Sequence, residues 1–369
     1  MFNLEPTEEQ QLMVQTAREL AKNEMDPKAH EADEAARTPE GFLAKSWELG
    51  IACPAIPEQY DGASMERSAL TGALILEELG AGDLSMALGL LAPASVAYPV
   101  LDYGTEAQKD KYLRACTAAE FPKLTAALLE PDYDFDPTAL RTVVTKDAKG
   151  YVLNGKKCRV PNGGLADTYL VYAREGSGEG FGAVSAFFVP KSTAGVTVSA
   201  KEKNLGLNAL DSVELTFENV HLPPDARLGG DKGCDFERIM SYSRIALSAL
   251  ALGVARRAYE HSVDYAKERK TWGQPIATRQ SVAFSVADMR MELDGARLLV
   301  WEAAWQLDKG NAATKESYLA KLITDEMVLK VTDEAVMIMG GHGFIRENPV
   351  ERWLRDGRGF AVFEGLAMV

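Results

Sequence analysis

The sequence predicts a mainly helical α+β protein in which a small antiparallel β domain separates two helical domains. The first third is dominated by Ala, Leu, Glu and Lys and has few strand-like stretches. In the middle third, Val213, Leu215 and Phe217 alternate with polar residues, the pattern of a half-buried strand. Long helical patterns fill the last third. We therefore expect an N-terminal α-helical domain, a central β domain and a four-helix-bundle-like C-terminal domain, over residues 1–120, 121–225 and 226–369.

The first helix begins at a clear signal. Residues 7–10 (Thr-Glu-Glu-Gln) form a capping box, and Met13, Ala17 and Leu20 follow on one stripe. Pro27 is expected near the end of this helix, since the residue before a proline avoids the helical conformation. Further helices are predicted over residues 40–50, 67–79, 84–101 and 105–118.

The central third contains strand and turn signals. Residues 151–155 (Tyr-Val-Leu-Asn-Gly) follow Lys149-Gly150, which indicates a strand entered from a hairpin turn. Residues 167–174 and 183–190 are apolar, β-rich runs bounded by Gly and Pro. These runs predict a small antiparallel sheet or barrel.

Helical patterns return after Pro223-Pro224. Gly310-Asn311 lies between the last two of them, and glycine is common just past a helix end. The long helices are predicted over residues 236–268, 277–308 and 313–339.

Charge and composition limit the classes of partner. At 369 residues the chain is long enough for two or three packed units, and 46% hydrophobic with 25% charged residues is ordinary for a soluble protein. A net charge of −14 argues against nucleic acid or an anionic membrane as the main partner. An anionic cofactor would need a local basic or backbone-amide site.

Cysteine and histidine usage predicts reduced thiols and no metal. Cys53, Cys116, Cys158 and Cys234 are widely spaced without a CxxC pair, which favours a cytoplasmic location. None of the four histidines has a partner at metal-ligand spacing. The N-terminal sequence lacks a secretory signal pattern, and we expect no apolar run that approaches the length of a membrane-spanning helix.

Glu364 is the most informative single residue. Apolar Phe363 precedes it and Gly365 follows it. A carboxylate in this setting could face a buried ligand and act as a general base. A partly buried glutamate at a helix end is the alternative, which this segment alone favours.

Four segments, in their order along the chain, carry a family resemblance. The most specific is 265–276 (Tyr-Ala-Lys-Glu-Arg-Lys-Thr-Trp-Gly-Gln-Pro-Ile), followed by Gln280. The others are 103–113, 339–344 and 349–356. Over essentially its whole length the chain resembles the acyl-CoA dehydrogenase family, flavin enzymes that desaturate acyl-CoA thioesters.

The resemblance implies an FAD site. Arg269 offers a guanidinium fork to a pyrophosphate, and Gly340-Gly341 lets the backbone approach the cofactor closely. Taken singly, Arg269 is better explained as an exposed cation at a helix end, and Gly340-Gly341 as a plain helix stop. In the family the ADP half of FAD is held across a subunit interface, which implies a homotetramer. The implied cofactor-binding positions are Leu129, Pro161, Arg269, Thr271, Trp272, Gln280, Met337, Gly340 and Gly341.

The resemblance also places Glu364 at the position of the catalytic base. Some relatives carry the base just before the residue that is Arg244 here, but Ser243 occupies that position. The implied mechanism is α-proton removal by Glu364 with β-hydride transfer to the flavin N5. Arg244, Tyr133 and Phe135 fall at substrate-binding positions.

Several positions depart from the family pattern. Leu129 and Pro161 replace hydroxyl residues beside the flavin, and Met337 replaces a glutamine. Tyr133 and Phe135 replace small residues at the pantetheine and nucleotide entry. Each lost hydrogen bond would cost roughly 0.5–1.5 kcal/mol, which tight FAD binding could survive.

Three functions therefore stay open. The first is an oxidoreductase of fatty acid metabolism, an FAD-dependent acyl-CoA dehydrogenase that passes electrons to an electron-transferring flavoprotein or, as a less favoured acceptor, to oxygen. The second is a redox-neutral acyl-CoA lyase that keeps the base and the CoA cleft. The third is a non-catalytic or half-site subunit of a heteromeric dehydrogenase, whose partner chain supplies the missing flavin contacts.

Overall fold

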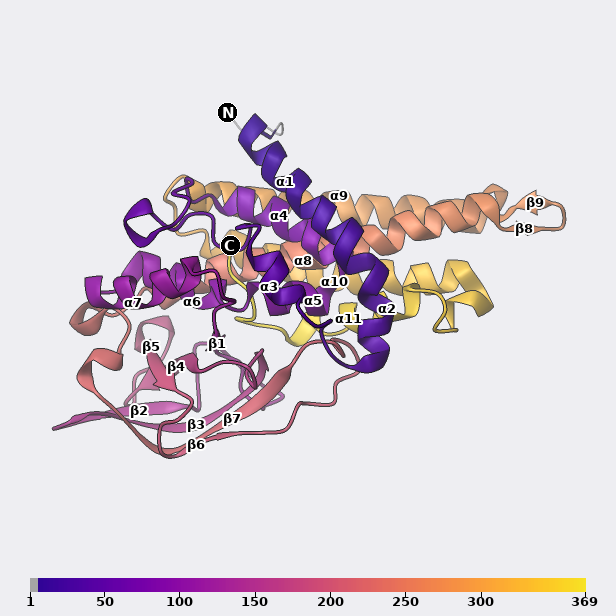
Figure 1. The fold of residues 1–369 in the computed structure, drawn as a ribbon. Coiled ribbons are helices and arrows are strands. Elements are labelled where there is room, and N and C mark those ends of the chain that lie inside the picture. Colours follow the sequence, from indigo (N-terminus) through magenta and orange to yellow (C-terminus); the bar gives the residue numbers. More distant parts are fainter. Residues whose placement is uncertain (1–5) are drawn as a thin grey trace.

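The computed structural model describes residues 6–369, in which helical layers lie against one side of a β domain (Figure 1). The N-terminal part is helical, as predicted. Its helices are α1 (Glu8–Leu20), η1 (Ala21–Met25), α2 (Asp26–Ala35), α3 (Phe42–Trp47), η2 (Glu58–Tyr60), α4 (Ala69–Gly82), α5 (Leu84–Leu91), α6 (Ala94–Tyr103) and α7 (Glu106–Thr117).

The first helix continues past the point where we expected it to end. The capping box of Thr7 and Gln10 starts α1 as predicted. The wider π-helical turn of η1 follows, and α2 then carries Pro27 in its first turn. Proline is tolerated there because the first turn of a helix has no backbone acceptor for its missing N–H. Pro27 thus lies at a helix start, and the predicted end was wrong.

The predicted helix over 84–101 is two helices. Ala92 and Pro93 separate α5 from α6, and Pro93 is the N-cap of α6. The span Leu84–Tyr103 is long and apolar enough to cross a membrane by length and composition, contrary to our expectation from the sequence. It is 94% buried inside the protein, however, as expected for a core element.

The β domain is a single sheet of mainly antiparallel strands. Its order is β1-β4-β2-β3-β7-β6, with β5 on β4, and β4 is parallel to both β1 and β2. Phe187, Phe217 and Tyr169 fill a core of its own between the strands. The strands are β1 (Leu124–Ala127), β2 (Val143–Asp147), β3 (Gly150–Pro161), β4 (Thr168–Glu175), β5 (Val184–Pro190), β6 (Val196–Val198) and β7 (Ser212–Leu222).

Three long helices dominate the C-terminal part. Between α8 and α9 the chain forms the hairpin β8–β9, which projects from the far end of these helices (Figure 1). Two short helices belong to the β domain and its end, η3 (Phe181–Ala183) between β4 and β5 and η4 (Pro224–Ala226) after β7. The C-terminal elements are η5 (Gly230–Lys232), α8 (Phe236–Glu268), β8 (Lys270–Thr271), β9 (Gln274–Pro275), η6 (Ile276–Thr278), α9 (Gln280–Asp308), α10 (Thr314–Met339), η7 (Gly340–Gly343), α11 (Val350–Gly357) and η8 (Phe360–Val362).

Helix α8 is the centre of the helical layers and packs on α4, α9, α10 and α11. Glycines allow it to cross α4 at close range. A Cβ added to Gly253 would lie 2.1 Å from the Glu77 backbone oxygen, and one added to Gly80 would lie 2.5 Å from the Leu250 backbone oxygen. These contacts are with backbone atoms, so a side chain could fit only if the helices moved apart.

We predict that Gly253→Ala lowers the free energy of unfolding by about 1–3 kcal/mol through overpacking, although Ala normally stabilises a helix interior relative to Gly. Urea or thermal unfolding monitored by circular dichroism would measure this. Gly182→Ala is the matched control, because nothing lies within 4 Å of its added Cβ. Equal or greater stability of Gly253→Ala relative to wild type would contradict the close crossing.

Candidate active site

The cavity that contains Glu364 lies where the β domain meets α10 and the C-terminal segment. Its volume is about 620 Å³. The wall from the β domain includes the segment after β1 and the end of β3, whereas α10 and the residues after α11 form the opposite wall. The lining residues are Leu129, Glu130, Pro131, Asp132, Tyr133, Phe135, Pro137, Cys158, Arg159, Glu202, Glu214, Lys321, Asp325, Ala361, Val362, Phe363 and Glu364.

The turn that carries Glu364 is fixed on both sides. Before it, Phe360 is fully buried, and its carbonyl accepts a hydrogen bond of 2.8 Å from Lys321 Nζ. After it, Gly365 has a φ of +71°, and a Cβ there would lie 2.5 Å from Leu128. Glycine is required at this position for both reasons. The side chain of Glu364 is therefore presented to the cavity from a rigid turn.

Arg244 and Glu364, to which the resemblance gave substrate-binding and catalytic roles, lie close together. The Nε of Arg244 lies 3.7 Å from Oε1 of Glu364, and both side chains are largely buried. The Arg244 guanidinium also stacks 5.3 Å from the ring centroid of Tyr318. The aromatic face and the carboxylate together hold this cation beside the cavity.

Buried polar atoms of Glu364, of its ion-pair partner Arg244 and of Ser243, next to Arg244 in the chain, have no hydrogen-bond partner within residues 6–369. They are Oε2 of Glu364, Nε of Arg244 and Oγ of Ser243. Buried polar groups are almost always paired in proteins, so such orphans require an explanation. A bound ligand that donates to the carboxylate and accepts from its neighbours would satisfy them.

A second carboxylate, Asp325 on α10, faces the same cavity and was missed in the sequence. Lys321 Nζ donates to its Oδ2 at 2.6 Å, while its Oδ1 is buried and without a partner in the described chain. Burial raises the pKa of Asp325 to about 6 despite the opposing effect of Lys321, and the charge of Glu364 adds to the increase. Two carboxylates from different elements thus line one cavity.

A signal for this pair was present in the sequence. Ser317, Thr324 and Val328 form part of the buried stripe of α10, and Lys321 lies on that stripe. A lysine on a buried stripe requires an internal partner. Asp325 is at the i+4 position relative to Lys321, where its carboxylate can reach the lysine.

A buried ion pair supports the cavity wall, which its Glu130 member lines. Lys157 is fully buried in β3 and donates to Glu130 Oε1 at 2.9 Å and to the Leu128 carbonyl at 2.8 Å. Burial lowers the pKa of Lys157 to about 8, against the opposing attraction of Glu130. The Glu130 carboxylate also accepts from the backbone N–H groups of Arg141 and Thr142. This network fixes the segment around Leu129.

The other residues predicted near the flavin ring and the substrate fall into two groups. Leu129, Tyr133 and Phe135 line the cavity, with Tyr133 fully exposed at its mouth. Pro161 is buried within β3 and does not line the cavity, whereas Arg159, two residues earlier, does.

Arg159 also lines a smaller neighbouring cavity of about 160 Å³, together with Val362 and Phe363. Its φ is +48°, at a bulge in the pairing of β3 with β7. The Glu202 carboxylate accepts a hydrogen bond from the Arg159 backbone N–H and holds it there. The two cavities thus adjoin along one shared wall.

The remaining predicted cofactor residues lie far from Glu364. Arg269 caps the end of α8, twenty-five residues beyond Arg244 and about 37 Å along the axis. The hairpin that follows it projects away from the β domain, and Trp272 at its turn is exposed (Figure 1). The other members of this group, on the hairpin, at the start of α9 and at the end of α10, are Thr271, Gln280, Met337, Gly340 and Gly341.

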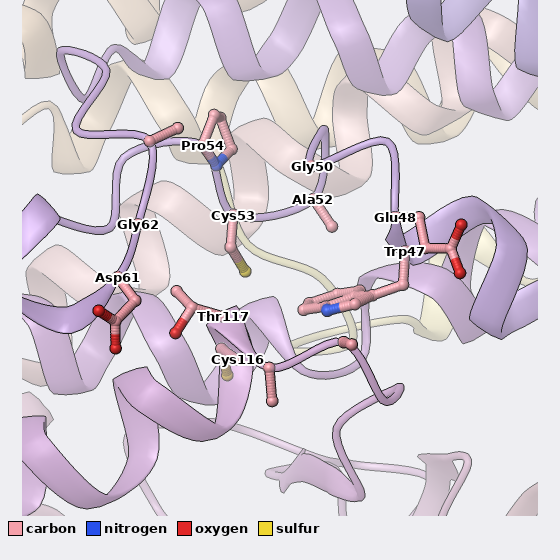
Figure 2. A pocket seen from close by; sticks show the side chains of 13 residues that line it. Trp47, Glu48, Gly50, Ala52, Cys53, Pro54, Asp61, Gly62, Cys116 and Thr117 are labelled. Atoms are coloured by element: carbon pink, nitrogen blue, oxygen red, sulfur yellow. The ribbon is translucent and has the colours of Figure 1, made fainter.

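A separate cavity of about 330 Å³ lies among the N-terminal helices. Trp47, Cys53, Cys116 and Thr117 surround the same space (Figure 2). Burial raises the pKa of Cys116 to about 12 and that of Cys53 well above its ordinary value. Thiols that stay protonated are poor nucleophiles, so this cavity does not suit thiolate chemistry.

Comparisons with known proteins give one consistent result. Three family models match: acyl-CoA dehydrogenase N-terminal domain over residues 7–120, middle domain over 125–220 and C-terminal domain over 235–368. An acyl-CoA dehydrogenase of Bacillus subtilis (strain 168) is 36% identical over 366 residues, covering 97% of this chain and 95% of the relative.

Solved structures agree. Butyryl-CoA dehydrogenase from Megasphaera elsdenii superposes with a TM-score of 0.88 at 32% identity, covering 98% of this chain and 96% of that one. The FAD complex of PigA superposes with a TM-score of 0.89 at 28% identity, covering 98% and 95%.

The raised pKa of Asp325 predicts a pH-dependent loss of stability. A carboxyl group whose pKa is about 6 in the folded protein, against an ordinary 3.8, binds its proton more tightly when folded. Deprotonation of Asp325 therefore lowers the free energy of unfolding as the pH rises from about 4 to about 6. Lys321, Glu326 and Glu364 are the charged groups that act on it.

We predict that Asp325→Asn matches wild-type stability near pH 4 and exceeds it by about 1–3 kcal/mol above pH 6. Unfolding curves at a series of pH values would measure the difference. Asp333→Asn, an exposed change on the same helix, is the control. A difference between Asp325→Asn and wild type that does not vary with pH would refute the prediction.

Proposed function

The chain belongs to the acyl-CoA dehydrogenase family, whose cofactor is FAD, and we propose that Glu364 is the base that removes the α-proton of an acyl-CoA thioester. The observation that carries this proposal is the place of Glu364 in the cavity wall, with its Oε2 buried and without a hydrogen-bond partner in residues 6–369. Arg244 holds the other oxygen, Oε1, at 3.7 Å. One oxygen is thus oriented while the other stays available to a proton.

The backbone of the same residue supplies a second function. The N–H of Glu364 donates to no backbone acceptor in the described part of the chain. We propose that it donates to the thioester carbonyl and stabilises the negative charge that develops as the α-proton leaves. Because Gly365 and Phe360 fix this turn, the backbone N–H donor and the carboxylate base of Glu364 keep the same position relative to one another.

The residues around the two adjoining cavities fit FAD. The orphaned polar atoms around Glu364 call for a ligand, and Arg159, Val362 and Phe363 line both spaces. We propose that the segment around Leu129 and the side chain of Arg159 hold the flavin ring. When bound, FAD supplies the acceptor for the β-hydride of the substrate at N5. The chain itself contributes the proton acceptor and the enclosing walls.

We propose a homotetramer in which a second copy holds the ADP half of FAD. Arg269 lies about 37 Å from Arg244 along α8, at about 1.5 Å per residue. A single dinucleotide is too short to bridge this distance. Phe284, Met291 and Leu298 form an exposed apolar row at seven-residue spacing on α9, the helix that starts beside the hairpin. Such a row on a soluble protein typically marks an interface.

The relatives support a proposal for the substrate class and the electron acceptor. We propose a short acyl-CoA, because butyryl-CoA dehydrogenase is among the similar structures. An electron-transferring flavoprotein is the proposed acceptor, in keeping with the family.

We predict that the purified protein is yellow and that butyryl-CoA bleaches it under anaerobic conditions. Glu364→Gln should retain the flavin but lower the rate of bleaching by about 10²–10⁴, because general base catalysis is lost. Stopped-flow absorbance would measure both rates. Glu326→Gln, an exposed carboxylate on α10, is the matched control and should bleach like wild type.

Other outcomes would identify the alternatives. A colourless, flavin-free homo-oligomer would refute the proposed dehydrogenase. Colour that develops only on co-expression with a second chain would show a half-site subunit. Release of an anion from an acyl-CoA without an electron acceptor would show a lyase.

We predict that Met291→Glu breaks the oligomer and lowers the amount of bound FAD, because the charge would be buried at the interface. Light scattering would give the mass, and the ratio of flavin to protein absorbance would give the FAD content. Leu12→Glu, an equally exposed change on α1, is the control. A Met291→Glu protein with unchanged mass and full flavin would exclude α9 from the interface.

A further inference from the structure

We propose that Lys321 is a positioning residue for the base Glu364 and that it acts through the backbone of the turn that carries this base. The inference rests on the proposed function, because it takes Glu364 as the base. Lys321 lies on the buried stripe of α10 and is only 5% exposed. A lysine is seldom buried without a specific partner, because its charge loses hydration. The hydrogen bonds of Lys321 therefore indicate what it does.

The first hydrogen bond holds the turn that precedes the base. Lys321 Nζ donates to the Phe360 carbonyl at 2.8 Å, and the same carbonyl accepts from the Phe363 backbone N–H at 3.2 Å. Phe363 is the neighbour of Glu364 in the chain. One buried carbonyl oxygen thus connects α10 to the residue next to the base. Loss of the ammonium group would remove one of the two hydrogen bonds that hold this carbonyl.

The second hydrogen bond cancels the charge of the lysine. Lys321 Nζ donates to Asp325 Oδ2 at 2.6 Å, one helical turn further along α10. The pair as a whole adds little net charge next to Glu364. Lys321 therefore acts on the base by fixing the geometry of the turn rather than by its charge.

A second helix holds the side chain of the same base. Arg244 on α8 places its Nε 3.7 Å from Glu364 Oε1. The two helices are themselves joined by a buried hydrogen bond of 3.0 Å from Thr324 Oγ1 on α10 to Ser248 Oγ on α8. Thr324 lies one helical turn beyond Lys321, and Ser248 one turn beyond Arg244. The backbone and the carboxylate of Glu364 are thus held from two helices that are fixed to one another.

This arrangement matters for proton removal. A base has to meet the α-carbon of the substrate within a narrow range of positions, and a misplacement of about 1 Å can slow a reaction about a hundredfold. Without Lys321, the carboxylate of Glu364 would keep its partner Arg244, but its backbone would lose the connection to α10. Removal of Lys321 should therefore slow proton removal while leaving the binding of the thioester nearly unchanged.

The test uses the full-length, FAD-loaded protein at about pH 8, where Asp325 is ionised because its pKa is about 6. Lys321→Met removes the donor but keeps an unbranched side chain of similar length. The double variant Lys321→Met/Asp325→Asn removes the donor and also the carboxylate charge that the single change leaves unpaired. Lys315→Met, at an exposed position near the start of α10, is the surface control.

Two measurements are made on each protein. Anaerobic stopped-flow bleaching by increasing concentrations of butyryl-CoA gives the limiting rate and the dissociation constant of the thioester separately. Hydrogen–deuterium exchange followed by mass spectrometry gives the protection of the backbone N–H groups in the peptide of residues 360–366. The exchange measurement does not depend on turnover.

We expect Lys321→Met and the double variant to bleach about ten- to a hundredfold more slowly than wild type, with the dissociation constant of butyryl-CoA within about threefold of the wild-type value. The 360–366 peptide should exchange faster in both variants, because the Phe360 carbonyl has lost a donor. Lys315→Met should match wild type in both measurements.

The double variant distinguishes positioning from a charge effect. If it recovers the wild-type rate, the slow bleaching of Lys321→Met came from the unpaired Asp325 carboxylate, and the proposal is overturned. Unchanged exchange of the 360–366 peptide, or a loss confined to the dissociation constant, also overturns it. Should Lys321→Met fail to fold, the charge-balanced double variant is compared directly with wild type.

Failure of the proposed function gives a different result. If no thioester bleaches wild type, or if Glu364→Gln bleaches like wild type, Glu364 is not the base, and the exchange measurement alone tests whether Lys321 holds the turn. If Glu364→Gln is slow but both Lys321 variants bleach like wild type, only the role of Lys321 is refuted.

Discussion

The close crossing of α4 and α8 is the constraint on which the rest of the structure depends. It holds α8 rigid from Arg244 at the cavity to Arg269 at the hairpin, and so fixes where each half of a cofactor can bind. The crossing is reinforced by charge. The largely buried carboxylates of Glu77 and Glu78 on α4 pair with Arg256 on α8 at 3.0 and 2.8 Å.

Local signals in the sequence predicted most helices and strands. Helix caps, apolar stripes on helices and the alternation of apolar and polar residues in strands each depend on only a few neighbouring residues. The capping box at Thr7 and the stop at Gly310 lie where the sequence placed them. The errors came from long-range structure. A π-helical turn allowed the chain to pass Pro27 without ending the helix, and Pro93 divided an apolar stretch that looks uniform. The parallel pairing of β4 with β1 and β2 has no local signal either.

The candidate site was predicted in part for a similar reason. The motif order led to Glu364 and Arg244, which lie together in the structure. Asp325 and Lys321 escaped notice because an i,i+4 pair of opposite charge usually lies on a solvated helix face. Only the packing of α10 shows that one oxygen of Asp325 is enclosed and unpaired. Burial of a single atom is a property of the assembled fold, which no short segment encodes.

The ion pair between Lys157 and Glu130 has a consequence for how this protein can evolve. Loss of either partner would strand a charge in the interior, at a cost of about 3–5 kcal/mol, whereas replacing both by apolar residues could be nearly neutral. The two positions are 27 residues apart in the chain. A single substitution at either one therefore lowers stability, and an alternative pair is reached without that loss only if both residues change. Descendants of this chain should keep both residues or exchange them together.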